Sequence, residues 1–496
     1  GTCPWMRAQH RKWYGRTYGT ITGNVTTMSP EKIGLWSHQQ AALAYLQGRQ
    51  CSLLDLAMGS GKSRVIVQYV CTTPAIQRVL ILCPRSFVQG WGAQFEQHGV
   101  QRDFLSALLD HTAGTVPQRV RTGQGVLAEA VRQLAGYVCV MNYDVCWRAG
   151  MAEFLRKAHF DLIVCDEIQR VRAGQTAVSR FVYKLSATIP IKIGLSGTPF
   201  PETPLDSYGV CRALDPTLLG TSWLRFRNRY AEMGGFMNYT VKRYINQEEL
   251  QTKINTLRFT MKPSGYELPA EQDIVIPLTL PPKVQKLYRT LATDLYSQVG
   301  YGSVTLANAA VAFTALQRLC SGVVVAEDAL GVKGYVFLHT LKEEALRDIL
   351  QSAPPQQCVV VLCRFHCDLA AVHTVAASVG RISTEVSGRP GHTPAHLRGG
   401  VWVGPETVLA VQGSAGVEGI DLTRAHVMVF YSYVLELGKF QQARARICRA
   451  GQAQPCTYYH LVVRDGIDQR IRVLLENKQQ VLQGLFASMK KGDKII

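Results

Sequence analysis

The sequence contains no apolar run that approaches the roughly 20 residues needed to span a bilayer. Its basic N-terminus also lacks the uninterrupted apolar core of a signal peptide. No internal repeat or low-complexity tract is visible, and no two cysteines form a Cys-x-x-Cys pair. These absences exclude a membrane-spanning protein and a repeat array. They also favour a buried strand over a zinc site at the one mixed cluster, which comprises Cys358, Cys363, His366 and Cys367.

Acidic residues are scarce relative to basic ones. The chain has 36 Asp and Glu against 54 Lys and Arg, which gives a formal net charge of +18. Such an excess favours a polyanionic partner, because Lys and Arg bound to phosphates release counterions. A membrane surface would need a basic amphipathic segment, and none is evident. The 14 cysteines lie mostly within apolar runs, which is typical of reduced core thiols and predicts an intracellular location.

Short apolar runs alternate with helical periodicity, which predicts an α/β fold built on parallel sheets. The expected strands are 52–56, 79–83, 138–141, 162–165 and 191–195 in the first half, and 358–362, 407–411, 427–431 and 457–462 in the second. Many of them end at a motif. Those motifs are therefore expected at the carboxyl edge of a parallel sheet, where open α/β folds bind ligands.

A chain of 496 residues is long enough for two or three packed domains. Pro263, Gly265, Pro269, Pro281 and Pro282 suggest a linker near the middle. The predicted segments are an N-terminal extension at 1–30, a first lobe at 31–205, a helical insertion at 206–261, the linker at 262–283, a second helical insertion at 284–340, a second lobe at 341–480 and a tail at 481–496.

A glycine-rich turn joins the first predicted strand to a helix and reads Leu-Ala-Met-Gly-Ser-Gly-Lys-Ser over 56–63. Gly59 and Gly61, on either side of Ser60, let backbone N–H groups converge on a phosphate. Lys62 is expected to reach the β- and γ-phosphates of a nucleoside triphosphate, and the Ser63 hydroxyl to ligate Mg²⁺. The alternative is a flexible glycine loop without such a role.

Two further motifs follow predicted strands. Asp166 suits a second Mg²⁺ contact, and the adjacent Glu167 suits orienting or deprotonating the attacking water; a solvated acidic turn is the alternative. Ser196 and Thr198, in Ser-Gly-Thr-Pro, are expected to connect the Mg²⁺ site to a neighbouring surface, although the tetrapeptide by itself is only a turn.

A third group of residues lies near the C-terminus. On a helix Gln442, Arg446 and Arg449 stand at i, i+4 and i+7 and share one face, while Arg444 points elsewhere. Two guanidinium groups on one stripe stabilise charge on a transferred phosphoryl group. A solvated basic helix is the alternative. A second glycine-bearing turn, with Gly419 and Asp421, comes shortly before this helix.

The order of these motifs resembles the SWI/SNF-like branch of helicase superfamily two over 35–471. Matching segments include the Met-Gly-Ser-Gly-Lys-Ser turn, Asp-Glu-Ile-Gln at 166–169, Leu-Ser-Gly-Thr-Pro at 195–199, Gly-Val-Glu-Gly-Ile-Asp-Leu at 416–422 and Gln-Ala through Arg-Ala-Gly-Gln at 442–452. Gln169 stands where the family has histidine, and Asp421 where it has asparagine.

The resemblance assigns further roles. It implies that Gln39 reads adenine, that Gly419, Asp421 and Gln442 contact ATP, and that Gln169, Ser196 and Thr198 couple hydrolysis to movement. By the same resemblance, strand-end residues contact DNA, and the candidates are Pro84, Arg85, Asn142, Tyr143 and Arg364.

The implied protein has two RecA-like lobes with helical insertions that close on ATP and Mg²⁺. It is expected to be a nucleic-acid-stimulated ATPase that steps along duplex DNA without sequence preference and remodels or displaces DNA or protein–DNA complexes. A protein partner on DNA is possible, no membrane is expected, and no further reader domain is expected. A cytoplasmic location in a bacterial or phage-infected cell is favoured over a nuclear one. The alternatives are a strand-separating or branch-migrating helicase and a non-catalytic DNA-binding scaffold.

Overall fold

The structure is a computed structural model. It describes residues 34–57, 59–99, 103–109, 114–197, 199–200, 203–234, 240–261, 269–294, 296–299, 302–305, 309–327, 332–389, 391–394, 397, 402, 404–413, 420–449 and 451–477. The predicted extension at 1–30 and the predicted tail at 481–496 lie outside these ranges. Gly1–Leu35 is a unit separate from Trp36–Ile496, and the fold below belongs to the second unit. Within the described ranges, no helix combines the length and the apolar character that crossing a membrane requires.

The first lobe is built on a seven-stranded sheet in which every pair of neighbouring strands is parallel, in the order β3-β4-β2-β5-β6-β1-β9. The strands are β1 (Cys51–Leu56), β2 (Arg78–Cys83), β3 (Phe104–Leu109), β4 (Gly136–Asn142), β5 (Leu162–Asp166), β6 (Ile191–Ser196) and β9 (Arg258–Met261). The central strands are continuous apolar runs because both faces of a parallel sheet are covered. Their carboxyl ends meet at one edge, which brings the turn after β1 and the turn after β5 together.

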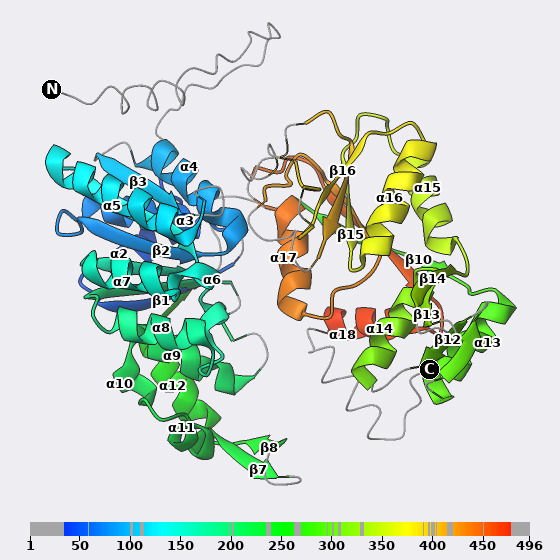
Figure 1. The fold of residues 1–496 in the computed structure, drawn as a ribbon, viewed down its shortest axis with the longest axis horizontal. Helices are drawn as coiled ribbons and strands as arrows, with labels where there is room; N and C mark the ends of the chain where they lie inside the picture. The colour runs from blue at the N-terminus through cyan, green and yellow to red at the C-terminus, as the bar shows by residue number, and fades with distance from the viewer. Residues whose placement is uncertain are drawn as a thin grey trace, which may run out of the picture. The chain divides into compact units, whose positions relative to one another are not determined.

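Helices cover both faces of this sheet (Figure 1). One face packs against α2 (Ser37–Leu46), α3 (Lys62–Thr72) and α4 (Val88–His98). The other packs against α5 (Val116–Gln133), α6 (Tyr143–Cys146), α7 (Ala149–Lys157), α8 (Ala177–Ser186) and α9 (Ser207–Leu214). Local signals set helix starts: Thr176 caps α8 by accepting from the Ser179 N–H at 3.1 Å.

The segment after α9 combines helices with strands. It holds α10 (Pro216–Leu219), α11 (Trp223–Tyr230), the antiparallel pair β7 (Ala231–Gly234) and β8 (Thr240–Tyr244), and α12 (Gln247–Leu257). The chain then returns to the first sheet as β9, which pairs with β1 at the edge. The sequence predicted only a helical insertion at 206–261, so these three strands are a difference. Short edge and hairpin strands carry too few residues for a visible period-2 pattern.

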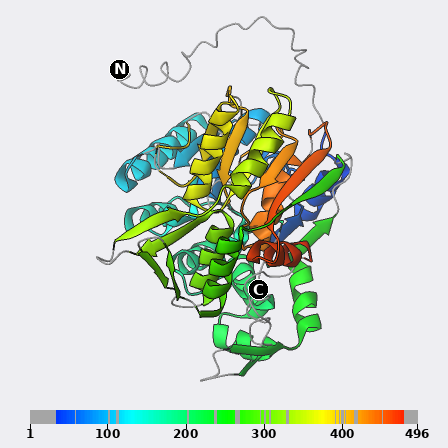
Figure 2. The ribbon, with the colours of Figure 1, turned by 90° about the vertical axis from the view of Figure 1, so that its right-hand side faces the viewer.

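The second lobe is built on a six-stranded sheet, again with every neighbouring pair parallel, in the order β10-β19-β18-β15-β17-β16. The strands are β10 (Glu271–Leu278), β15 (Val359–Cys363), β16 (Ser383–Val386), β17 (Val408–Gln412), β18 (Val427–Phe430) and β19 (Cys456–Val463). Figure 2 shows β10 beside β19, although they are far apart in the sequence.

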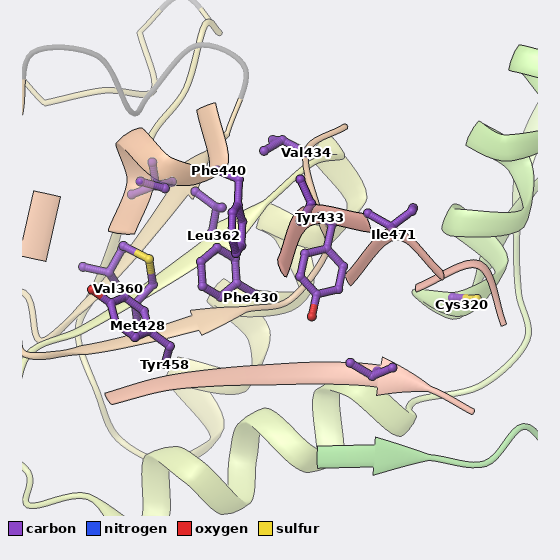
Figure 3. Close-up of a cluster of buried hydrophobic side chains, with 14 of the residues drawn as sticks. Cys320, Val360, Leu362, Met428, Phe430, Tyr433, Val434, Phe440, Tyr458 and Ile471 are labelled. Carbon is purple, nitrogen blue, oxygen red and sulfur yellow. The ribbon is translucent and has the colours of Figure 1, made fainter. Parts of the chain in front are cut away.

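Helices also cover both faces of the second sheet. α15 (Leu341–Ser352) and α16 (His366–Ser378) pack on one face. The other face packs against α13 (Pro282–Asp294), α14 (Ala309–Cys320), α17 (Leu437–Ile447) and α18 (Ile467–Glu476). Figure 3 shows this second core, where Phe440 of α17 lies against Phe430 of β18 with ring centroids 5.0 Å apart. This contact fixes the face that α17 turns toward the sheet.

The predicted fold class, an α/β protein with two parallel-sheet lobes, is confirmed. Two segments differ from the prediction. β10 lies inside the predicted linker at 262–283, and the predicted helical insertion at 284–340 holds a four-stranded antiparallel sheet. Its strands are β11 (Tyr296–Val299), β12 (Gly302–Thr305), β13 (Val323–Glu327) and β14 (Lys333–Phe337). β10 escaped prediction because prolines flank it and Pro277 lies within it; an edge strand tolerates proline.

Candidate nucleotide site

The glycine-rich turn at 56–63, hereafter the P-loop, runs from the carboxyl end of β1 to the first turn of α3. Gly59 has φ of 75° and Gly61 has φ of 77°, a left-handed conformation that glycine adopts without steric cost. Gly61 also occupies the N-cap of α3, so the helix N-terminus with its unpaired N–H groups faces the turn. Met58, between strand and glycines, lies outside the described residues.

Lys62 folds back onto the P-loop. Its Nζ donates to the carbonyl oxygens of Leu56 at 2.8 Å and Ala57 at 3.2 Å. Burial lowers the pKa of Lys62, while the nearby carboxylates of Glu167, Asp166 and Asp55 raise it and Arg446 lowers it. A partly buried cation is thus held close to the acidic pair and to an arginine of the second lobe.

Gln39 and its neighbour His38 are buried against the P-loop. The Ser60 carbonyl accepts from Gln39 Nε2 at 3.0 Å and lies 2.8 Å from His38 Nε2. Because a carbonyl only accepts, the second contact requires the Nε2–H tautomer of His38. Gln39 Oε1 in turn accepts from the Trp36 N–H at 3.0 Å. Gln39 therefore positions the P-loop, and its contact with adenine stays a prediction.

Substituting alanine for Gly61 tests this packing. A Cβ at Gly61 would lie 2.3 Å from Gln39 Nε2, whereas one at Gly48, which has a similar φ of 73°, would meet nothing within 4 Å. Both variants pay the left-handed backbone cost of about 1–2 kcal/mol in unfolding free energy. We expect only Gly61→Ala to weaken ATP binding as well, by about 10-fold or more. A loss of about 1.4 kcal/mol, for one displaced contact, corresponds to a 10-fold change in affinity. Thermal unfolding and equilibrium ATP titration of both variants check this; equal affinities would contradict it.

Asp166 and Glu167 lie at the end of β5, on the same sheet edge as the P-loop. The Asp166 carboxylate accepts from the Trp91 indole N–H at 2.9 Å and from the Glu167 N–H at 3.1 Å. Burial, and after it the charge of Glu167, raise the pKa of Asp166 to about 7, although the hydrogen bond from Trp91 and the charge of Lys62 oppose the shift. Glu167 has φ of 51°, which is strained for a residue with a side chain. Residues in this conformation cluster at active sites, although Leu134, His159, Asn246 and Asp465 of this protein share it.

A hydrogen-bonded relay links Glu167 to the next strand. Gln169 Nε2 donates to Glu167 Oε2 at 2.6 Å, and the Ser196 hydroxyl donates to Gln169 Oε1 at 2.8 Å. An amide serves both contacts at once because it carries a donor and an acceptor, and it does so without titrating. Thr198, predicted in the same coupling role, lies outside the described residues.

The residues present fit a nucleotide and a divalent cation. Among the described residues, the buried oxygens Ser60 Oγ and Gln442 Oε1 have no hydrogen-bond partner, which is costly unless a ligand or water supplies one. For Mg²⁺, the chain offers the Asp166 carboxylate and the Ser63 hydroxyl. Mg²⁺ is commonly held by one or two protein oxygens together with phosphates and water. Within the described ranges, no group of three His, Cys, Asp or Glu is suited to holding a metal.

Of the two predicted arginine fingers, Arg446 lies on the predicted helix with Gln442, whereas Arg449 is placed differently from the prediction. Gln442 and Arg446 belong to α17, but the helix ends at Ile447 and Cys448 has extended backbone, with φ of −93° and ψ of 90°. Arg449 therefore lies beyond the helix and does not share a helical face with Gln442, because the 3.6-residue period stops before it. A Cβ built on Gly59 would lie 3.1 Å from Arg449 Cβ, so Arg449 is beside the P-loop.

Asp421 contacts Arg449 in the second lobe. Arg449 Nη1 lies 3.7 Å from Asp421 Oδ2, and Asp421 Oδ1 accepts from the Thr423 N–H at 2.9 Å. Gly419, two residues earlier, lies outside the described residues. Gln452 then closes this region, since its Nε2 donates to the carbonyl oxygens of Thr423, Ala425 and Ile447 at 3.0, 2.9 and 3.2 Å. Gln452 was not among the predicted site residues, and it ties the end of α17 to the Asp421 turn.

The predicted DNA contacts are only partly exposed. Asn142 and Tyr143 are buried, and the Tyr143 hydroxyl donates to the Asp166 carbonyl at 2.9 Å. The Arg364 guanidinium packs over Phe365 and contacts Gln317, and burial is the main cause that lowers its pKa to about 10. These three side chains serve internal contacts, so their predicted role on DNA has no support from geometry.

Pro84 and Arg85 are the remaining candidates for DNA contact. Pro84 is buried and follows β2, whereas Arg85 is exposed and begins the short helix η1 (Arg85–Phe87). Position at a strand end was correctly read from the sequence, but side-chain direction was not. Among the five predicted residues, Arg85 presents a cation at the surface.

Two supporting residues were missed. Trp91 donates its indole N–H to the Asp166 carboxylate. The sequence signal was a tryptophan on a buried helix face, because a buried indole N–H needs an acceptor. Asp55 lies within β1 and accepts from Arg258 Nε at 2.7 Å. A carboxylate inside an apolar strand signals a buried partner, although the sequence does not identify which arginine supplies it.

Comparison with known proteins gives relatives of low identity. DNA repair and recombination protein RDH54 of Saccharomyces cerevisiae is 23% identical over 442 residues, which cover 82% of this chain and 44% of the relative. An uncharacterised ATP-dependent helicase of Mycoplasma pneumoniae is 21% identical over 463 residues, covering 90% and 42%. The chain thus spans less than half the length of both relatives. The SWI2/SNF2 ATPase core of Sulfolobus solfataricus in complex with double-stranded DNA is 17% identical with a TM-score of 0.40, covering 95% of this chain and 96% of its own.

A protein family also matches the chain over one continuous range. The sequence profile of the SNF2-related domain matches residues 9–322, which include the P-loop, Asp166, Glu167 and the Ser196 motif. Because this match covers more than half of the 496 residues, the chain belongs to the SNF2-related family.

Proposed function

We propose that this protein is an ATP-dependent translocase on double-stranded DNA, which remodels or displaces DNA or protein–DNA complexes. The observation that carries the proposal is the convergence at the P-loop. Lys62 interacts electrostatically with Glu167, Asp166 and Arg446, and Arg449 lies beside Gly59. Residues from both lobes therefore have a common target, which fits the phosphates of ATP.

The roles follow from the chemistry of each group. Lys62 and the N-terminus of α3 bind the phosphates, and Gln39 holds the P-loop against α2 near the adenine. Glu167 orients the attacking water, while Arg446 and Arg449 stabilise charge that develops on the γ-phosphoryl group. Ser63 and Asp166 would hold Mg²⁺, which supplies neutralisation of charge on the phosphate oxygens. Gly419, Asp421 and Gln442 complete the nucleotide contacts from the second lobe.

Duplex DNA is the proposed track. The net charge of +18 favours a polyanion, and the family relationship to a DNA repair and recombination protein points to DNA. Contacts to phosphates alone give stepping without sequence preference. We further propose a protein partner on the DNA and an intracellular site of action, in bacterial or phage-infected cytoplasm; the free thiols of the described cysteines are compatible with a reducing compartment.

The decisive experiment measures ATP hydrolysis with no polymer, single-stranded DNA, duplex DNA and RNA in parallel. We expect duplex DNA to stimulate most, and displacement of a triplex-forming strand to accompany hydrolysis. DNA affinity should also fall steeply between low and moderate salt. Greater stimulation by single-stranded DNA together with fork unwinding would favour a strand-separating helicase. Binding of DNA without hydrolysis under any condition would favour a scaffold.

The Gln169 relay yields a separate prediction. Gln169→Ala breaks both the contact to Glu167 and that to Ser196, so we expect DNA-stimulated hydrolysis to fall about 10- to 100-fold, as for a mispositioned catalytic group. Hydrolysis without DNA should change much less if Gln169 acts in coupling, because Glu167, Lys62 and Asp166 all remain at the site. The control is Gln251→Ala, which removes an exposed amide that donates to Asn255 at 2.9 Å. Equal losses with and without DNA would contradict a coupling role for Gln169.

A further inference from the structure

Helix α17, which carries Arg446, is bound to the second sheet in two ways. Its apolar side chains Phe440, Ala443 and Ile447 lie in the core beneath it. Such contacts are non-directional, so they define the position of the helix along the strands less sharply than hydrogen bonds do. A directional contact is needed to fix the position of the helix along the strands.

Arg444 supplies that directional contact. Its Nη1 and Nη2 bind the two oxygens of Asp273, with Nη2 at 3.1 Å from Oδ2, and Nη2 also contacts Glu271 at 2.9 Å. Both acids belong to β10. The guanidinium carbon lies 3.8 Å from the ring centre of Tyr458, whose hydroxyl donates to the Arg444 carbonyl at 3.1 Å. The Arg444 side chain is 20% exposed and that of Asp273 is 37% exposed, so the pair is only partly shielded from water.

The Asp273 carboxylate is itself held from the other side. His460 Nε2 lies 2.8 Å from Asp273 Oδ1, and the Tyr433 hydroxyl lies 2.9 Å from His460 Nδ1. Burial lowers the pKa of His460 even though Asp273 raises it, which favours the neutral ring. A neutral ring with its proton on Nε2 donates to Asp273 and accepts from the Tyr433 hydroxyl, so both ring nitrogens of His460 have a suitable partner.

We infer that Arg444 and Asp273 are positioning residues that fix helix α17 along the second sheet and thereby aim Arg446 and Arg449 at the P-loop. A bidentate Arg–carboxylate pair is suited to this because its two parallel hydrogen bonds define both distance and orientation. Arg444 is two residues from Arg446 and five from Arg449, so any displacement of the helix reaches both. This role rests on the proposed ATP hydrolysis, because positioning matters only if the arginines act on a phosphoryl group.

The test compares Arg444→Gln, Arg444→Lys and Asp273→Asn with a control on the same helix. The control is Lys439→Gln, which removes an ion pair with Glu436 at 3.0 Å. We expect Arg444→Gln and Asp273→Asn to lower kcat for DNA-stimulated hydrolysis about 10- to 100-fold, the loss that follows a misplacement of about 1 Å. The KM for ATP should change less than about threefold, because the P-loop is untouched. Arg444→Lys should not restore the rate, since lysine keeps the charge but not the fork.

Hydrogen exchange without nucleotide gives a readout that does not depend on hydrolysis. Amides of α17 should exchange faster in Arg444→Gln than in the parent and in Lys439→Gln. Provided that the parent hydrolyses ATP, three results would each overturn the inference. They are unchanged exchange of the α17 amides in Arg444→Gln, faster exchange in a variant whose kcat equals that of the parent, and full rescue of the rate by Arg444→Lys. If Arg444→Gln unfolds, judged by circular dichroism, Asp273→Asn decides by the same criteria. If the parent protein does not hydrolyse ATP, the proposed function is overturned instead. Faster exchange of α17 amides would then show only that Arg444 anchors the helix.

Discussion

Lys62→Ala is expected to lower ATP turnover by about 10³-fold or more while the protein stays folded. The loss follows because Lys62 Nζ is held on the carbonyl oxygens of Leu56 and Ala57 in the P-loop, and removing one preorganised charge partner of a transition state costs about 10²–10³-fold by itself. The fold survives because Lys62 is only partly buried, so water can replace Nζ at Leu56 and Ala57. Turnover, ATP affinity and thermal unfolding of the variant, measured together, check this.

Lys192→Ala is the matched control. Lys192 is also partly buried on the first sheet, and its Nζ donates to two carbonyl oxygens, those of Ile189 at 2.9 Å and Pro190 at 3.3 Å. It lies at the amino end of β6, away from the edge that carries the P-loop. The control should therefore lose the same kind of hydrogen bonds without losing turnover. Parental turnover in Lys62→Ala would remove the P-loop assignment, and a collapse of both variants would point to stability alone.

The first-lobe site was readable from the sequence because its motifs are short and local. Each follows a buried strand, and parallel strands bring their carboxyl ends to one edge, so the P-loop and Asp166 had to be neighbours. What could not be read was the second layer of contacts. Trp91 and Asp166 are hydrogen-bonded although they are 75 residues apart in the sequence, and Gln169 accepts from Ser196, which is 27 residues away. No local sequence pattern encodes such pairings.

The second lobe was harder to predict, for two physical reasons. β10 contains Pro277, and proline inside a strand argues for a linker unless the strand lies at an edge, which only the tertiary fold reveals. The end of α17 was also hidden, because helical periodicity continues through Arg449 in the sequence while the backbone leaves the helix at Cys448. Helix ends are decided by local backbone geometry and packing more than by periodicity.

The position of Arg449 beyond the end of α17 predicts a large effect of its removal. Because Arg449 leaves the helix and lies beside Gly59, we expect Arg449→Ala to lower DNA-stimulated kcat by about 10³–10⁵-fold, the range for an arginine finger. ATP affinity should change little, since Lys62 and the α3 N-terminus still bind the phosphates. Single-turnover hydrolysis and equilibrium ATP binding separate the two effects.

Two comparisons make the Arg449 prediction specific. Arg472→Ala removes an arginine of the same lobe with similar side-chain exposure, 23% against 27% for Arg449, and it pairs with Glu476; it should keep nearly parental hydrolysis. The double variant Arg449→Ala with Asp421→Asn removes the acid along with the arginine, and it is compared with Asp421→Asn alone because Asp421 is itself a proposed ATP contact. If the only task of Arg449 were to neutralise Asp421, this double variant would recover activity. An arginine that acts on the γ-phosphoryl group cannot be replaced in this way, so the double variant should stay as inactive as Arg449→Ala.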